Sequence, residues 1–235
     1  GNKVELLLVA GGINTHGTWY DTHDGATAYD GVNQNVDRLD VPQPPNPVCW
    51  DDDGDPVRSY TSGNATLDPG WYPAGIRVVG GNIVLKSGLY CLDGNFSALG
   101  GSISVEPNGG IMIYQRGGDF NIGGNVIVNI NAPKELYDKA GNPWSGMLVY
   151  MDPANTGIVY IDGGANTSYS GTILALGPAS PVTRTKCTII GNSDSFSFNS
   201  QLICYSINIT GNATTNINYE VDDNYVVPGI LDLMK

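Results

Sequence analysis

Short apolar runs separated by turn residues fill the chain from Gly75 to Ile130. Each run holds three to five residues, and Gly, Asn, Asp or Ser separates it from the next, so no run is long enough for a helix. This cadence predicts short β-strands joined by tight turns. The runs begin at Ile76, Ile83, Leu89, Phe96, Ile103, Ile111, Phe120 and Val126.

The runs recur with a regular period. Taking every third run gives spacings of 20 (76 to 96), 20 (83 to 103), 22 (89 to 111), 24 (96 to 120) and 23 (103 to 126) residues. Three short strands per repeat predict one coil of a parallel β-solenoid. Each strand then pairs with the strand one coil earlier, and its side chains alternate between a packed interior and solvent. We therefore predict an all-β fold, a right-handed parallel β-helix with an irregular N-terminal segment.

The repeat divides the chain into two parts. Residues 1–58 are predicted to form the irregular segment, with short strands and a proline-rich connector at 42–47, and residues 59–235 to form the β-helix domain. Residues 1–12 contain one apolar stretch, predicted to be a strand that caps the solenoid or pairs with a neighbour. Such a cap is needed because solenoid ends expose unpaired strand edges.

One segment interrupts the rhythm of the second part. Residues 131–145 carry charges and two prolines, which predicts an inserted loop with one helical turn over 134–140. The strands predicted after this loop are 147–151, 158–161, 172–176, 188–190, 196–198, 201–209 and 216–221.

Composition narrows the class of partner. The net charge of −12 argues against nucleic acid, whose phosphates require basic surfaces. An acidic chain with only 14% charged residues suits an extracellular or cell-surface setting, although an acidic face that only maintains solubility fits equally well. The sequence contains no apolar run of 18 residues, so no membrane span is predicted within it.

Four cysteines predict two disulfides. Cys187 and Cys204 lie 17 residues apart, roughly one coil, so they are expected to stack on neighbouring rungs, and Cys49 would then pair with Cys91. The alternative is that some of the four are buried free thiols. No cysteine spacing typical of a zinc site is present.

A calcium site is one reading of the acidic stretch after the connector. Asp51, Asp53 and Asp55 alternate as in loops that gather carboxylate oxygens around a hard cation. An EF-hand loop needs Gly at its sixth position and Glu at its twelfth, and Pro56 and Ser62 stand there instead. Calcium is therefore a candidate cofactor, and an acidic turn is the alternative.

Catalysis is the less favoured reading of the polar residues. Polysaccharide lyases and hydrolases also use β-helices, with clustered carboxylates and a basic residue, and Asp93, Asp119 and Arg116 are the candidates here. However, no row of Asp recurs on one face, and Asp is an ordinary corner residue. A second group of polar residues matches no known spacing and is interpreted as part of a surface loop: His16, Asp21, His23 and Asp24.

Five Asn-x-Ser/Thr triplets are candidate glycosylation sites. Because Asn is common at solenoid corners, most of these residues are interpreted as turn residues instead. The triplets begin at Asn64, Asn95, Asn166, Asn208 and Asn212.

One resemblance covers roughly residues 62–220. The stretch LDPGWYPAGIRVVGGNIVLKSGLYCLDGNFSALGGSISVEPNGGIMIY is followed by VNINAP, SGMLVYMDP, SGTILAL and NSQLICYSINITGNATTNINY. This order resembles the β-helical C-terminal domain of bacterial tight-adherence (Tad) pilus proteins of the TadG-like kind. The resemblance implies an envelope-exposed domain linked to pili or surface attachment, without a known catalytic centre. The N-terminal membrane helix of such proteins has no counterpart here, which leaves the mode of anchoring open.

These observations predict an extracellular structural or adhesive surface protein, a pilus- or filament-associated subunit. Its expected partners are further copies of itself, joined through solenoid ends and sheet edges into a homo-oligomer or filament, and surface glycans. Two alternatives stay open: a carbohydrate-active β-helix enzyme, and a calcium-dependent glycan-binding module.

Overall fold

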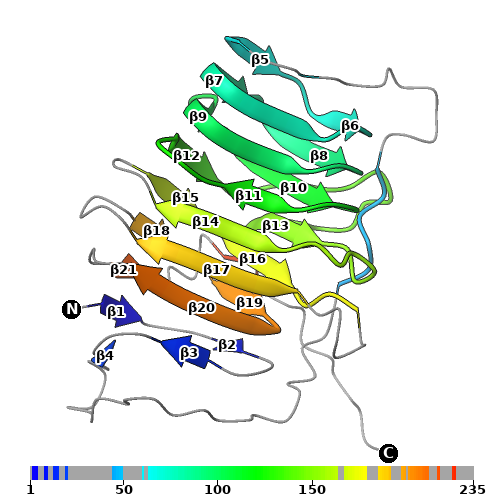
Figure 1. Cartoon of the computed structure of the whole chain (residues 1–235). Helices are drawn as coiled ribbons and strands as arrows, with labels where there is room; N and C mark the ends of the chain where they lie inside the picture. The colour runs from blue at the N-terminus through cyan, green and yellow to red at the C-terminus, as the bar shows by residue number, and fades with distance from the viewer. Residues whose placement is uncertain are drawn as a thin grey trace, which may run out of the picture.

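A computed structural model (Figure 1) describes residues 2–4, 8–9, 13–15, 19–20, 44–49, 60, 63–163, 167–178, 185–191, 197–199, 201–211, 216–217 and 224–225. In this part of the chain all regular secondary structure is β-strand, and residues 134–140 form no helical turn. The strands are β1 (Asn2–Val4), β2 (Leu8–Val9), β3 (Ile13–Thr15), β4 (Trp19–Tyr20), β5 (Ala65–Leu67), β6 (Gly70–Tyr72), β7 (Ile76–Leu85), β8 (Gly88–Leu92), β9 (Phe96–Val105), β10 (Ile111–Gln115), β11 (Phe120–Ile122), β12 (Ile127–Asn131), β13 (Met147–Met151), β14 (Val159–Gly163), β15 (Ser168–Ser170), β16 (Thr172–Ala175), β17 (Lys186–Gly191), β18 (Ser197–Asn199), β19 (Leu202–Cys204), β20 (Ser206–Gly211) and β21 (Asn216–Ile217).

The strands form one 14-stranded sheet and one 7-stranded sheet, and neighbouring strands within each sheet are parallel. The pairings define three columns. Column 1 holds β5, the second halves of β7 and β9, then β12, β15, β18, β21, β1 and β4. Column 2 holds the first halves of β7 and β9, then β11, β14, β17, β20 and β3. Column 3 is the smaller sheet, β6, β8, β10, β13, β16, β19 and β2.

The predicted period is confirmed in part by the strand register. Three of the five spacings are matched residue for residue: Ile76↔Phe96, Ile83↔Ile103 and Phe96↔Phe120. The other two differ by one or two residues, because Ile111 pairs with Gly88 and Ile103 pairs with Val128. The prediction of an all-β fold with parallel strands is confirmed.

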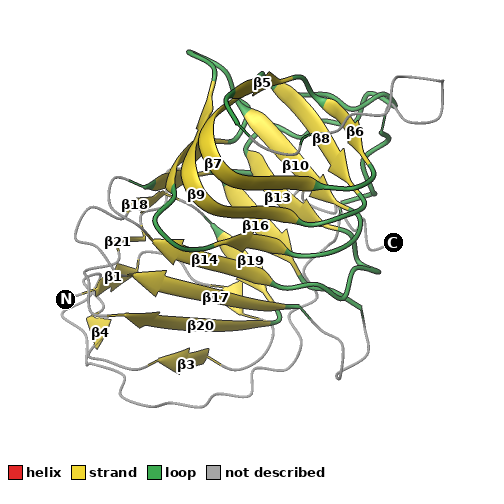
Figure 2. Ribbon diagram, turned by 45° about the horizontal axis from the view of Figure 1, so that its top comes forward, coloured by secondary structure: helices red, strands yellow, loops and turns green. Residues whose placement is uncertain are grey.

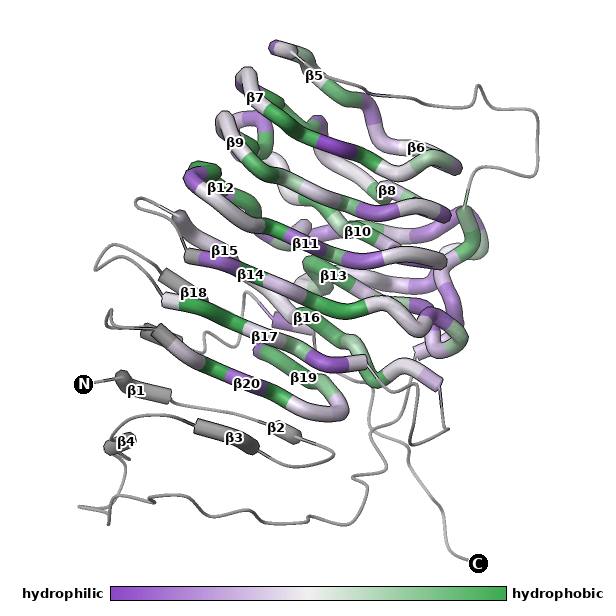
Figure 3. Tube along the Cα trace, in the orientation of Figure 1, coloured by the Kyte–Doolittle hydropathy of each residue, from purple (hydrophilic) through white to green (hydrophobic). Residues whose placement is uncertain are grey.

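Columns 1 and 2 show the predicted alternation of side chains. In β7, Ile76 and Val78 are buried, whereas Arg77 and Val79 are exposed, and the alternation of apolar and polar positions is visible along the strands in Figure 3. The buried side chains meet between the two sheets and stack on equivalent residues of the next rung. One such pair is Phe96 and Phe120, whose ring centroids lie 5.3 Å apart.

Column 3 departs from that alternation, because both of its faces are buried. The inner face contributes Tyr90 and Ile113 to the main core, while the outer face contributes Cys91, Met112 and Tyr114 to a second apolar cluster. The prediction that outward side chains meet solvent is therefore wrong for this sheet. The reason lies in its strands, which are unbroken apolar runs such as IMIY and MLVYM, a pattern typical of sheets covered on both sides.

The cover of column 3 comes from segments outside the columns. Trp144 of the inserted loop is fully buried and packs against Tyr150 and Tyr225, with ring centroids 5.5 and 5.9 Å away. The proline-rich connector also lies on this face, where the Tyr150 hydroxyl donates to the Pro44 carbonyl at 3.1 Å. The second cluster therefore joins the connector and the loop to the sheet.

Asp138 fixes this outer layer. Its side chain is only 5% exposed, and its Oδ2 accepts hydrogen bonds from the Val48 N–H at 3.1 Å and from Trp144 Nε1 at 3.3 Å. Its Oδ1 accepts the N–H groups of Ala140 and Asn142, both at 2.9 Å. The Asp138 carboxylate thus links Val48, which directly follows the connector, to the inserted loop.

Both predicted disulfides are present, Cys49–Cys91 and Cys187–Cys204, with Cα–Cα distances of 6.2 and 6.1 Å. The expected stacking of Cys187 and Cys204 on neighbouring rungs is wrong. Cys187 pairs in register with Ile207, 20 residues later, whereas Cys204 lies in column 3. Seventeen residues are less than one circuit, so this disulfide crosses the core between the two sheets.

The N-terminal strands extend the columns at the end opposite β5. β1 pairs with β21, β2 with β19 and β3 with β20, and in Figure 1 these blue strands lie below the orange β20. Within residues 1–12, the described residues 2–4 and 8–9 form two short strands where one was predicted, and these strands lie where the cap was expected. The domain boundary near residue 58 stays a prediction.

Substitution of Gly101 tests how closely neighbouring rungs approach each other. β9 bends between its two halves (Figure 2), and Gly101 lies at this bend because Ala98 pairs in column 2 and Ser102 in column 1. Gly101 has φ +89° and leaves no room for a Cβ beside the Gly81 carbonyl oxygen. Gly80 also has positive φ, +151°, but a Cβ there would meet nothing within 4 Å. We expect Gly101→Ala to lower the free energy of unfolding by about 3 kcal/mol and Gly80→Ala by about 1 kcal/mol, measured by urea denaturation. Equal losses would contradict this rung spacing.

Asp138 gives a prediction that depends on pH. Burial alone would raise its pKa, but the hydrogen bonds from Asn142, Val48 and Trp144 lower it below the ordinary value of 3.8. We expect Asp138→Asn to lower the free energy of unfolding by about 2 kcal/mol at pH 7, measured by urea denaturation. Because the folded-state pKa is depressed, this stabilisation is present above pH 3.8 and is lost as the pH falls toward the folded-state value.

The matched control for that prediction is Glu135→Gln, which removes the same charge from an exposed side chain of the same loop. We expect this variant to have the same free energy of unfolding as the parent chain, both at pH 7 and in acid below pH 3.8. A difference between Asp138→Asn and the parent that persists unchanged in acid would contradict the role assigned to the carboxylate.

Candidate functional site

The catalytic candidates Asp93 and Arg116 meet at a corner beside column 3. Arg116 Nε donates to Asp93 Oδ1 at 2.7 Å, and Trp71 Nε1 donates to Asp93 Oδ2 at 2.7 Å. The guanidinium carbon also lies 5.8 Å from the Trp71 ring centroid. Burial would raise the Asp93 pKa, but the hydrogen bonds from Arg116 and Trp71 lower it. The Asp93 carboxylate therefore stays ionised, and both of its oxygens accept hydrogen bonds. This arrangement suits a clamp that joins Trp71, Asp93 and Arg116 of neighbouring rungs better than a proton donor.

Asp119, the third candidate, is a corner residue. Its Oδ1 accepts the Ile158 N–H at 2.9 Å, and its own N–H donates to Asn95 Oδ1 at 2.9 Å. Asn95 and Asp119 thus form a polar ladder that satisfies backbone donors from one rung to the next. Both hydrogen bonds link Asp119 to neighbouring rungs, which agrees with the reading of Asp as a turn residue.

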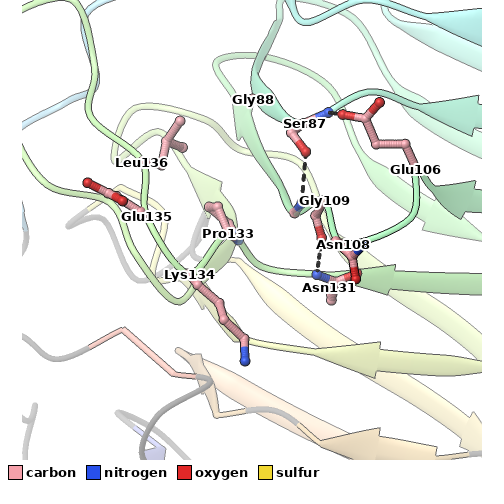
Figure 4. A pocket seen from close by; sticks show the side chains of 11 residues that line it. Ser87, Gly88, Glu106, Asn108, Gly109, Asn131, Pro133, Lys134, Glu135 and Leu136 are labelled. Atoms are coloured by element: carbon pink, nitrogen blue, oxygen red, sulfur yellow. Dashed lines mark hydrogen bonds between the residues drawn. The ribbon is translucent and has the colours of Figure 1, made fainter.

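A cavity of about 630 Å³ lies at the corner between columns 1 and 3 (Figure 4). The Ser87 N–H donates to Glu106 Oε1 at 2.7 Å, which lowers the Glu106 pKa, and Asn131 Nδ2 donates to the Gly109 carbonyl at 2.7 Å. Figure 4 shows Lys134 and Glu135 pointing away from Ser87. The polar groups therefore serve contacts between rungs and do not converge on one point in the cavity.

Several sequence candidates lie outside the described residues. Within the described ranges, no group of three or more His, Cys, Asp or Glu residues is placed to hold a metal ion. The calcium reading of the acidic stretch stays a prediction. The candidates outside the description are His16, Asp21, His23, Asp24, Asp51, Asp53, Asp55, Asn166 and Asn212.

The three described glycosylation candidates hold different positions. Asn64 and Asn95 are exposed at corners, and the Oδ1 of each accepts a backbone N–H of the next rung, from Asn82 at 2.8 Å and from Asp119 at 2.9 Å. Asn208 lies within β20, and its Oδ1 is enclosed without a hydrogen-bond partner. The corner interpretation thus fits Asn64 and Asn95 and is wrong for Asn208.

The end of the columns at β5 is the candidate interaction site. Within the described residues, β5 pairs only with β7, β6 only with β8, and the first half of β7 only with β9. Three backbone hydrogen bonds mark the groups that point into the columns: Lys86 N–H to Leu67 O (3.0 Å), Asp93 N–H to Tyr72 O (3.3 Å) and Ile76 N–H to Asn95 O (2.9 Å).

The residues adjacent in sequence to Leu67, Tyr72 and Ile76 point their backbone N–H and C=O groups out of the columns. Successive residues of a strand alternate in the direction of their N–H and C=O groups, so Thr66, Trp71 and Arg77 present theirs away from the columns. We call the backbone of these three residues the head edge. Sequence reasoning predicted interacting ends but could not name these residues, because the direction of each group depends on the strand register.

Among the described residues, the end of the columns opposite β5 also consists of strands that are paired on one side only. Among the described residues, β2, β3 and β4 each pair with a single strand, and we call these three strands the tail edge. Since all the ladder pairings are parallel, the head edge and the tail edge present strands that run in the same direction. A tail edge can therefore continue the parallel sheets of a head edge on another copy.

No family model, curated protein or solved structure matches this chain. The two disulfides are compatible with an oxidising extracellular environment. Among the described residues, no helix is long and apolar enough to cross a membrane.

The corner clamp gives a testable prediction. We expect Arg116→Gln to raise the Asp93 pKa, because it removes a hydrogen bond and a positive charge from a carboxylate that burial alone would make harder to ionise. NMR titration of the side-chain carboxyl carbons measures this change. Lys134→Gln, at an exposed residue, is the charge-matched control and should leave the Asp93 titration unchanged. An Asp93 pKa that is the same in Arg116→Gln would contradict the clamp.

Proposed function

We propose that this chain is a right-handed parallel β-solenoid that serves as an extracellular structural and adhesive element, adding copies end to end. The observation that carries the proposal is the one-sided pairing of the strands that form the head edge. Unpaired N–H and C=O groups on a strand edge are a template for another strand. The tail edge of a second copy supplies strands of matching direction.

The geometry of this contact favours a filament. The head edge and tail edge are different surfaces, so the contact between copies is heterologous, and a heterologous contact that does not close into a ring continues as a fibre. This arrangement agrees with the resemblance to pilus-associated proteins, which implies attachment at a surface.

The outer face of column 2 supports the adhesive part of the proposal. Its register aligns polar side chains that carry hydroxyl and amide groups on successive rungs, and such groups form hydrogen bonds with sugars. These residues are Ser97, Asn121, Tyr160 and Thr188.

Thr66→Pro tests the proposed assembly. Proline removes the outward N–H of Thr66, while the inward hydrogen bond from Lys86 to the Leu67 carbonyl, 3.0 Å long, is retained. We expect the parent chain to form end-to-end rods with rising concentration, and Thr66→Pro to need at least about tenfold more protein for the same association. Sedimentation velocity measures the association, and electron microscopy shows the arrangement of the copies.

Thr66→Val is the matched control, since it keeps the N–H and a β-branched side chain. It should associate like the parent chain. A parent chain that stays monomeric at all concentrations, or equal association of Thr66→Pro and Thr66→Val, would overturn the proposed mode of assembly.

A further inference from the structure

Four aromatic side chains form a continuous stack on the outer face of column 3. Tyr114 and Tyr150 pair in register on β10 and β13, and their ring centroids lie 5.7 Å apart. Trp144 continues the stack, with its ring centroid 5.5 Å from that of Tyr150 and 5.9 Å from that of Tyr225. All four side chains are buried, and Tyr225, at 8%, is the most exposed of them. Ring contacts alone therefore lead from Tyr225 to Tyr114.

The hydroxyl of Tyr114 meets a different kind of acceptor from the hydroxyl of Tyr150. Tyr114 donates to Oδ2 of Asp152, a carboxylate that is also held by Asn46, whose Nδ2 donates to the same oxygen at 3.0 Å. Tyr150 instead donates to two neutral oxygens, the Pro44 carbonyl at 3.1 Å and Asn46 Oδ1 at 3.3 Å. Because a carboxylate is a much stronger base than an amide oxygen, Tyr114 has a proton acceptor in place and Tyr150 has none.

Tyr114 keeps its proton in the resting chain. Burial and the hydrogen bond to Asp152 both raise the pKa of the Tyr114 hydroxyl above its ordinary value of 10.0. Removal of one electron from a phenol, however, makes its proton strongly acidic. The proton then moves along the existing hydrogen bond to Asp152, so the charge created on the ring is neutralised at once.

Trp144 is suited to carry a positive charge for a short time. Its Nε1 donates to Oδ2 of Asp138 at 3.3 Å. Burial alone would raise the Asp138 pKa, but the hydrogen bonds from Asn142, Val48 and Trp144 lower it, so this carboxylate is a weak base that keeps its charge. A fixed negative charge beside the indole stabilises a positive charge on it without removing its proton. The charge can therefore pass through Trp144 and settle elsewhere in the stack.

We infer that Tyr114 is a site of one-electron oxidation, with Asp152 as the acceptor of its proton. The electron leaves through Tyr150, Trp144 and Tyr225 in turn, and a small oxidant in solution, of the class of oxygen-centred radicals, takes it. The oxidant gains one electron, the Tyr114 hydroxyl becomes a neutral phenoxyl radical, and the Asp152 carboxylate becomes a carboxylic acid. This activity is independent of the proposed assembly of copies.

The sulfur groups of the same cluster give this site a use. Met112, Met147 and the disulfide Cys49–Cys91 belong to the second apolar cluster together with the aromatic stack. Oxidation of a methionine to its sulfoxide places a polar oxygen in an apolar contact and disrupts the packing around it. Tyr114 loses only an electron and a proton, so an oxidising equivalent that rests there leaves these sulfur atoms unchanged.

Photo-oxidation of the full chain tests the site. The probe is a ruthenium polypyridyl complex that is excited by light in the presence of a sacrificial electron acceptor, and electron paramagnetic resonance measures the yield of long-lived tyrosyl radical. Radicals on exposed side chains such as Tyr137, 56% exposed, combine in solution and do not contribute to a long-lived signal. We expect Tyr114→Phe, which keeps the ring and removes the hydroxyl, to lower this yield at least about tenfold.

Tyr90→Phe is the matched control. Tyr90 is equally buried and lies on the inner face of the same sheet, but its hydroxyl donates to the carbonyls of Leu67 and Lys86, both at 2.8 Å, and to no carboxylate. This variant should give the radical yield of the parent chain. Mass spectrometry of the same samples should find more methionine sulfoxide at positions 112 and 147 in Tyr114→Phe than in Tyr90→Phe.

Two measurements test the transfer of the proton. Asp152→Asn keeps the size of the side chain and removes the base, so we expect the same loss of radical as in Tyr114→Phe. The parent chain should form the radical more slowly in heavy water than in ordinary water, because the proton moves with the electron. This second measurement needs no substitution and therefore does not depend on the folding of a variant.

Each contrary result overturns a defined part of the inference. A radical yield in Tyr114→Phe equal to that of the parent chain, or an equal loss in Tyr90→Phe, overturns the assignment to Tyr114. An unchanged yield in folded Asp152→Asn, or equal rates in the two solvents, overturns the proton transfer. A Trp144→Phe variant that forms the radical as fast as the parent chain overturns the route, and equal methionine sulfoxide in all variants overturns the protective use.

Discussion

The parallel hydrogen bonding of each strand to the strand one rung away is the constraint on which this structure depends. It requires the chain to return to the same place after each circuit, so the residues at the corners must turn sharply or satisfy backbone donors. Gly101 meets the first requirement with a φ of +89°. Asn95 and Asp119 meet the second, because their side-chain oxygens accept N–H groups of the following rung. The same constraint leaves unsatisfied groups at the end of every column.

A second layer makes the columns asymmetric. One sheet presents polar residues outward, whereas column 3 is covered by the connector, the inserted loop and the pair Asn224 and Tyr225. Trp144 and Asp138 connect these segments, so parts of the chain far from each other in sequence stabilise one face together. Lateral contact through column 3 is thereby blocked in this region. The ends of the columns and the outer faces of columns 1 and 2 are left for interaction.

The repeat was predictable because it is local: the period of the apolar runs located β7 and β9 and gave register pairs such as Ile76 with Phe96, and β13 stood out as an unbroken apolar run. The outer layer was not predictable, since the contact of Val48 with Asp138 joins residues 90 apart and leaves no periodic trace. The strand Ser168–Ser170 was missed because polar residues flank its single buried Tyr169. Asp93 and Arg116 were candidates only in the less favoured catalytic interpretation of the sequence, and their mutual hydrogen bonds indicate a clamp.

Fibre diffraction from an oriented, concentrated sample tests the central claim most directly. Strands stacked in columns and continued from copy to copy lie across the long axis, which predicts a strong meridional reflection at about 4.8 Å. A sample that does not align, or one whose reflection at about 4.8 Å lies on the equator, would show that the strands do not continue along the assembly and would contradict end-to-end addition.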